Sequence, residues 1–157
     1  MKKAIGILLI LLVSIGCDSD PFKEDIIEGF NLDASIDFSV VNSKNEDLLN
    51  PSNPDSYDPK KIKILFLLDG KLVPQYQANL DSPNFFMIYQ NSDRYAIRIF
   101  LNHNPKEKFP ETYIQWNEND KDIVKVEYSR TKNSTTKKNV WLNDQVIAKP
   151  TYLTITK

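Results

Sequence analysis

Hydrophobic and polar residues follow two different patterns along the chain. Residues 4–15 (AIGILLILLVSI) form an unbroken run without a charge, and Lys2 and Lys3 precede it. Beyond residue 32 the apolar residues instead alternate with polar ones over short stretches, which is the period of a strand with one buried face. The two patterns predict an N-terminal segment that is separate from a strand-rich domain.

Strands are predicted wherever this alternation persists or a short apolar run is bounded by turn residues. Residues 34–40 alternate strictly, and residues 94–101 place Tyr95, Ile97 and Ile99 on one face. The run 62–68 (IKILFLL) is apolar enough to be a central strand. Further strands are predicted at residues 71–73, 85–90, 112–116, 122–130, 140–142, 146–148 and 151–156.

Turn residues separate these strands. Asp69-Gly70 lies between two predicted strands and indicates a hairpin with a type I′ turn, and Asn143-Asp144 is a second hairpin signal. Pro74 favours an edge position or a bulge for the strand that contains it. Residues 42–60, with three prolines and many Asn, Asp and Ser residues, predict a loop whose Leu48-Leu49 pair packs on the core.

About nine or ten short strands, with no convincing 3.6-residue apolar stripe beyond residue 17, predict an all-β fold. We expect an antiparallel β-sandwich or a barrel, with an immunoglobulin-like sandwich favoured. The disulfide of antibody domains would be absent, because Cys17 is the only cysteine. The predicted organisation is a signal peptide at residues 1–16, a tether at 17–31 and a single domain at 32–157.

The N-terminal segment has the layout of a secretory signal. Two lysines, an apolar run and the small residue Gly16 lead directly to Cys17. A run of this length is short of the roughly 20 residues that span a bilayer. An uncleaved N-terminal anchor is the alternative interpretation. A lone cysteine in an exported protein also needs an explanation, because exported domains normally use cysteines in pairs.

Residues 13–17 (Val-Ser-Ile-Gly-Cys) resemble the lipobox of bacterial lipoproteins. Gly16 and Cys17 match that pattern, whereas Ser14 replaces its usual leucine. The resemblance implies cleavage before Cys17 and lipidation of its thiol, so that lipid on this residue attaches the protein to a membrane. Two or three acyl chains hold a protein stably, whereas one does so only marginally.

Four of the eight residues at 18–25 are acidic. A solvated tether explains them, but they also resemble the lipoprotein export signal of Bacteroidota. That resemblance implies the outer membrane and the cell surface, with the periplasmic face as the alternative. The order of features in the rest of the chain is similar to small Bacteroidota surface lipoproteins of unknown function.

Composition excludes two classes of ligand. Of 157 residues, removal of 16 leaves 141, and the loss of two lysines leaves 18 basic against 21 acidic residues, a net charge of −3. Such a chain lacks the basic surface that nucleic acids require. Only Gly29 and Gly70 remain, which excludes a glycine-rich phosphate loop.

The residues that usually carry catalysis or hold metals are sparse. His103 is the only histidine and lies in a predicted loop; as a general base it would need a nucleophile and an orienting acid that the fold places beside it. Glu118, Asp120 and Asp122 alternate as calcium ligands can, but the glycine and glutamate that complete a calcium loop are missing. We therefore predict no catalytic residue, no metal site and no cofactor.

Aromatic residues in the late strands are the candidate ligand contacts. They are Tyr113, Trp116, Trp141 and Tyr152. Exposed, such rings stack on sugars or anchor a protein partner, and core packing is the alternative. If Ile114 marks the core, Trp116 is buried with it and Tyr113 faces outward.

These observations favour a membrane-anchored, exported and non-enzymatic module that binds a protein partner or takes part in envelope assembly. One alternative is a carbohydrate-binding accessory lipoprotein, which requires exposed aromatic residues on one surface. A second is a hydrolase built on two carboxylates, which requires the two acids to face each other in a cleft.

Overall fold

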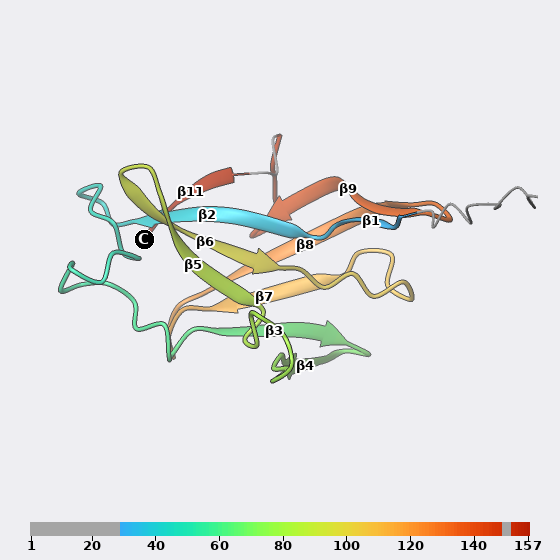
Figure 1. Cartoon of the computed structure of the whole chain (residues 1–157), viewed down its shortest axis with the longest axis horizontal. Helices are drawn as coiled ribbons and strands as arrows, with labels where there is room; N and C mark the ends of the chain where they lie inside the picture. The colour runs from blue at the N-terminus through green and yellow to red at the C-terminus, as the bar shows by residue number, and fades with distance from the viewer. Residues whose placement is uncertain (1–28, 149–151) are drawn as a thin grey trace, which may run out of the picture.

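The computed structural model describes residues 29–148 and 152–157, so the predicted signal peptide and Cys17 lie outside the described residues. Strands, turns and loops make up this part of the chain (Figure 1). No helix in it has the length and apolar character needed to cross a membrane. Two sheets enclose one hydrophobic core, which confirms the prediction of an all-β sandwich. The immunoglobulin-like topology stays a prediction.

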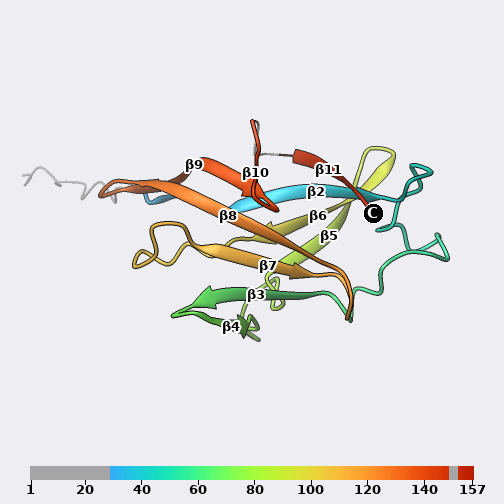
Figure 2. The same cartoon turned by 180° about the vertical axis from the view of Figure 1, so that it is seen from behind.

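The larger sheet has seven strands in the order β1-β9-β8-β7-β3-β4, and β10 extends it beside β9. Figure 2 shows this sheet from behind, with β8 running along its middle. Its strands are β1 (Asn31–Asp33), β3 (Lys63–Leu68), β4 (Lys71–Pro74), β7 (Glu111–Gln115), β8 (Lys121–Arg130), β9 (Ser134–Leu142) and β10 (Gln145–Val146).

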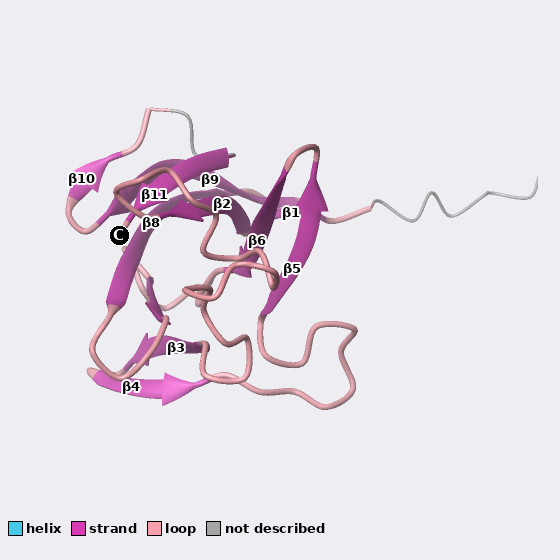
Figure 3. Cartoon of the chain, turned by 90° about the vertical axis from the view of Figure 1, so that its left-hand side faces the viewer, coloured by secondary structure: helices cyan, strands magenta, loops and turns pink. Residues whose placement is uncertain are grey.

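The smaller sheet has four strands in the order β11-β2-β6-β5 and packs over the larger one (Figure 3). Its strands are β2 (Ser35–Val41), β5 (Phe86–Asn91), β6 (Arg94–Phe100) and β11 (Tyr152–Thr156). Most neighbouring strands are antiparallel, as predicted. However, β1 runs parallel to β9 and β11 runs parallel to β2, so both sheets are mixed and the purely antiparallel prediction is wrong at these two pairs.

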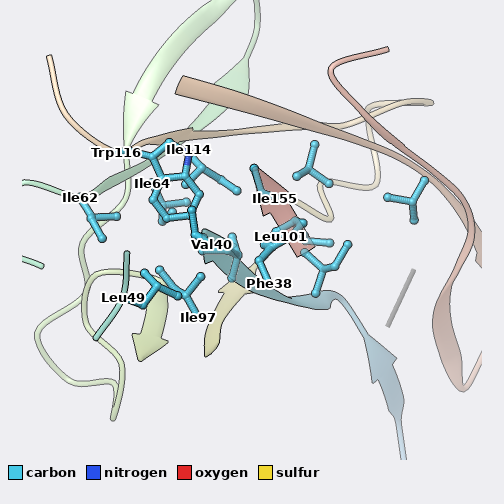
Figure 4. Close-up of a cluster of buried hydrophobic side chains, with 14 of the residues drawn as sticks. Phe38, Val40, Leu49, Ile62, Ile64, Ile97, Leu101, Ile114, Trp116 and Ile155 are labelled. Atoms are coloured by element: carbon cyan, nitrogen blue, oxygen red, sulfur yellow. The ribbon is translucent and has the colours of Figure 1, made fainter. Parts of the chain in front are cut away.

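Alternating residues of both sheets meet in the core (Figure 4). The fully buried side chains include Ile36, Phe38, Val40, Ile64, Ile97, Ile99, Ile114, Trp116, Val124, Val126 and Val140. Leu48 and Leu49 from the loop after β2 are also buried, as predicted. Burial of this apolar surface is the main force that holds the two sheets together.

The predicted hairpin turns are present. Asp69 and Gly70 connect β3 to β4 with φ values of 49° and 75°, and Asn143 and Asp144 connect β9 to β10 with 49° and 65°. Two successive positive φ values are the requirement of a type I′ turn. Pro74 lies on β4, the edge strand of its sheet, where a missing N–H leaves no ladder hydrogen bond unmade.

Candidate functional site

The outer face of the larger sheet carries three rows of side chains that run across its strands. Strand register places Lys63, Gln115 and Lys121 side by side in the first row. The second row is Pro74, Leu65, Tyr113 and Ile123. The third contains Glu111, Lys125 and Trp141. An apolar row with a tyrosine at its centre therefore lies between a polar row and a row in which two charged residues lie beside Trp141.

A cleft of about 530 Å³ opens on this face beside Tyr113. Leu65 and Leu72 form its apolar wall, and Gln115 and residues 117–121 from the β7–β8 turn form its polar wall. A neighbouring cleft of about 540 Å³ shares Gln115 and residues 117–119 and adds three lysines, at positions 60, 61 and 63. The two clefts are thus adjacent and share these lining residues, and together we call them the β7–β8 cleft.

Several polar groups of the β7–β8 cleft are not used inside the protein. Among the described residues, the side chains of Gln115, Glu118 and Asn119 make no hydrogen bond or ion pair. The Asn117 carboxamide oxygen instead accepts from the backbone N–H groups of Asn119 and Asp120, at 2.8 and 3.0 Å, and so shapes the turn. The free donors and acceptors are available to a ligand.

Tyr113 is half-buried at the border of this cleft, as its alternation with Ile114 predicted. Its hydroxyl donates to Glu111 Oε2 at 3.1 Å, which holds the ring along the sheet face. Burial, together with this hydrogen bond and the charge of Glu111, raises the pKa of the Tyr113 phenol. The phenol therefore stays neutral and presents an apolar ring with a polar tip.

Trp141 lies on the same face as Tyr113 but two strands away. Two strand spacings and a two-residue offset separate their Cα atoms by about 12 Å. The Trp141 ring packs edge-to-face on Phe109 at 5.9 Å, and the Lys125 ammonium lies 5.7 Å from its centre. Tyr152 is 40% exposed on β11, the edge strand of the other sheet. Tyr152 thus belongs to a different surface from Tyr113 and Trp141.

Trp116 is fully buried, which removes it from the candidate ligand contacts. Its ring stacks on Tyr57 with a centroid distance of 5.4 Å, and its indole Nε1 donates to Asp122 Oδ2 at 2.6 Å. Figure 4 shows Trp116 beside Ile64 and Ile114 in the core. The core-packing alternative is therefore correct for this residue.

Asp120 and Asp122, two of the alternating acids, take part in an ion network around Lys157. The Lys157 ammonium donates to Asp120 Oδ1 at 2.7 Å and contacts Asp122 Oδ2 at 2.6 Å. Tyr57 donates to the other oxygen of Asp120 at 2.5 Å. Burial raises the pKa of Tyr57, and the hydrogen bond to Asp120 raises it further. A lysine thus lies between the two acids, and sequence reasoning had no signal for it.

The remaining candidates do not converge on one place. His103 is exposed in the loop between β6 and β7, where its Nδ1 donates to the Leu101 carbonyl at 3.1 Å. Glu118 is exposed in the β7–β8 turn, apart from the ion network. No group of three His, Cys, Asp or Glu side chains in the described ranges is arranged to hold a metal ion.

Comparisons with known proteins give no family for this chain. No protein-family model matches it, no curated protein matches it, and no solved structure matches it. The interpretation of the site therefore depends on its own geometry.

Proposed function

We propose that this protein is an exported, lipid-anchored and non-enzymatic binding module that presents the outer face of its larger sheet to a partner protein of the cell envelope. Lipidation of Cys17 would attach it to the outer membrane, with the domain at the cell surface or on the periplasmic face. The observation that carries the binding proposal is the uncovered apolar row around Tyr113 beside the β7–β8 cleft. A half-exposed aromatic residue with free polar groups at its rim is typical of protein interfaces.

The arrangement of the acids supports a non-enzymatic role. Asp120 and Asp122 are close to each other, but Lys157 binds both of them and the Asp122 side chain is only 5% exposed. A carboxylate held in this way is poorly placed to exchange protons with a substrate. Its chemistry is that of a structural ion pair that fixes the β7–β8 turn and β11.

A glycan ligand is the second candidate, and the side chains of the β7–β8 cleft favour it. Tyr113 offers a ring face, while Gln115 and Asn119 offer carboxamides that can donate to and accept from hydroxyl groups. The two candidates differ in what they need from the surface. A glycan requires the carboxamides and the ring together, whereas a protein partner also covers the apolar residues Leu65 and Ile123.

Photocrosslinking in intact cells tests the binding proposal. A photoreactive residue in place of Ile123 should give a discrete protein adduct, and the same residue in place of Met87 is the matched control. Met87 is 40% exposed but lies on β5, the edge strand of the smaller sheet. Adducts of equal yield at both positions, or at neither, would contradict the proposal. If Tyr113→Ala and Gln115→Ala instead abolish retention on purified envelope polysaccharide, the glycan candidate replaces it.

The anchor has its own test. Mass spectrometry of the native protein should find a chain that begins at Cys17 with acyl groups on that residue. Behind a general secretory signal, Cys17→Ser should move the protein from the membrane to the soluble fraction. An uncut N-terminus or an unmodified thiol at position 17 would overturn the lipid anchor without affecting the binding proposal.

A further inference from the structure

The N-terminal side of the domain meets two loops at one end of the sandwich. The Asn31 N–H donates to the Asn133 carbonyl at 2.9 Å, which joins the start of β1 to the β8–β9 turn. Arg130 Nη2 donates to the His103 carbonyl at 3.0 Å, which joins that turn to the β6–β7 loop. Figure 1 shows these segments together, away from the C-terminal residue. We call residues 30–33, 80–82, 102–108 and 130–134 the β1 end.

The β1 end exposes large apolar side chains around a hollow. Phe30, Leu32 and Leu80 are 59%, 49% and 42% exposed. Leu32 and Leu80 also line an apolar cavity of about 320 Å³, whose wall includes Phe85 and Phe100. Exposed apolar side chains gathered beside an apolar cavity mark a surface that contacts another phase or another molecule.

Basic residues surround this apolar surface. The β6–β7 loop contributes Lys106 and Lys108, and the β8–β9 turn contributes Arg130 and Lys132, all exposed. The acids of the same end are fewer. Asp81 and Glu107 remain, and Asp33 is paired with the ammonium of Lys137. The end therefore carries a net positive charge although the whole chain is slightly negative.

We propose that the β1 end rests on the surface of an anionic lipid bilayer, with Phe30, Leu32 and Leu80 against the acyl–headgroup boundary and the basic residues against the headgroups. This inference depends on the proposed lipid at Cys17. Twelve residue steps lead from Cys17 to Gly29, which limits their separation to about 40 Å. Because β1 is the first described strand after that tether, the end that contains it is the part of the domain whose distance from the lipid anchor is limited most closely.

The combination matches the physical requirements of interfacial binding. Apolar side chains supply burial at the headgroup boundary, and cations supply attraction to anionic lipid. Neither contribution needs to be strong, because the covalent anchor keeps the domain at a high local concentration near the surface. A partner protein on this end is less favoured, because the tether keeps this end within reach of the bilayer at all times.

Tryptophan quenching on proteoliposomes tests the proposal with the lipidated protein. Leu32→Trp is the probe and Met87→Trp, on β5, is the matched control. The vesicles contain phosphatidylglycerol and phosphatidylcholine, with brominated acyl chains as the quencher. Quenching of the added tryptophan at position 32, with none at position 87, is expected. Lys106→Glu with Lys108→Glu, or vesicles of phosphatidylcholine alone, should reduce that quenching severalfold.

The outcomes separate this inference from the anchor. If the protein floats with the vesicles but neither added tryptophan is quenched, the lipid anchor is supported and the proposed contact of the β1 end with the bilayer is overturned. Equal quenching at positions 32 and 87 also overturns it, because the domain then has no fixed orientation. If the purified protein does not float with vesicles at all, the proposed lipid anchor fails.

Discussion

Replacing Lys157 with methionine removes the ammonium between Asp120 and Asp122 and keeps most of the apolar stem. The Lys157 and Asp122 side chains are only 16% and 5% exposed. Removal of one partner from a buried ion pair costs about 3–5 kcal/mol, because the other charge stays buried without compensation. The loss should therefore be several times that of a surface ion pair.

Two features of the network reduce the expected loss. Asp122 keeps hydrogen bonds from Trp116 Nε1 at 2.6 Å and from Asn143 Nδ2 at 2.7 Å. The Asp120 side chain is 28% exposed, so water can solvate it when the ammonium is gone. We therefore expect Lys157→Met to lower the free energy of unfolding by about 3 kcal/mol, at the lower end of the range. For a domain of this size that corresponds to a fall in Tm of roughly 10 °C.

Guanidinium unfolding followed by tryptophan fluorescence measures this loss. The matched control is Lys138→Met, which breaks an ion pair with Glu127 at 3.3 Å in which the lysine is 59% exposed. That change should cost under about 1 kcal/mol. Addition of Asp122→Asn to Lys157→Met should recover part of the loss, since it removes the buried charge. Similar losses for the two lysine variants, or no recovery in the double variant, would refute the reasoning.

Two further predictions concern stability at other places. Burial raises the pKa of Asp37, but hydrogen bonds from Arg98 and Tyr89 and the charges of Arg98 and Lys137 outweigh burial and hold it below its ordinary value. The carboxylate therefore stabilises the fold above about pH 4 and loses this effect as the pH falls through its lowered pKa. The difference in Tm between the wild type and Asp37→Asn should shrink at acidic pH. A difference that does not change with pH would contradict the stabilising role of the Asp37 carboxylate. Tyr128 has a buried hydroxyl without a hydrogen-bond partner in the described chain, so Tyr128→Phe should be neutral or stabilise the protein by about 1 kcal/mol in urea unfolding; a loss of more than about 1 kcal/mol would refute this.

Local patterns predicted the strands whose two faces differ in burial. β8 alternates between buried and more exposed residues from Lys121 to Glu127, and β2 and β6 do so over Ser35–Phe38 and Ile97–Phe100; the same alternation is visible in the sequence. The Asp69-Gly70 turn was predictable because few residue pairs adopt positive φ twice in succession. These features depend on residues that are neighbours in the chain, and that is why they can be predicted from the sequence.

Elements that depend on distant residues were not predictable in the same way. β1 was not predicted, because Asn31 ended the predicted tether and the next two residues preceded the first predicted strand. The first six residues of β9 (Ser-Thr-Thr-Lys-Lys-Asn) are too polar to suggest a strand. The structure explains β9 through its partners: Lys137 is buried against Asp33 and the Ser35 carbonyl, and β1 pairs with residues 134–136. The partners are about a hundred residues apart in sequence, so no local pattern could reveal them.

The candidate site shows the same division. Alternation with Ile114 predicted that Tyr113 faces outward and that Trp116 is buried. The neighbours of Tyr113 were not predictable, because Leu65 and Ile123 reach it through the register of three strands. Lys157 likewise meets Asp120 across 37 residues, by way of the parallel pairing of β11 with β2. Sequence reasoning can assign a face to a residue, but register decides which residues share a site.

The two proposed surfaces lie at opposite ends of the same strands. β7 and β8 run between the β1 end and the β7–β8 turn, and β8 has ten residues from Lys121 to Arg130. At about 3.3 Å per residue, the turn lies roughly 30 Å from the β1 end. If the β1 end rests on the bilayer, the β7–β8 cleft therefore points away from the membrane by about that distance, into the space where an envelope protein or a glycan can reach it. An orientation with the cleft against the lipid would instead bury its free lysines and carboxamides at the headgroups and leave Phe30 and Leu32 in water. A lipid-anchored protein that binds a ligand through this cleft needs its membrane-facing surface and its binding surface to lie apart. The length of β8 provides that separation.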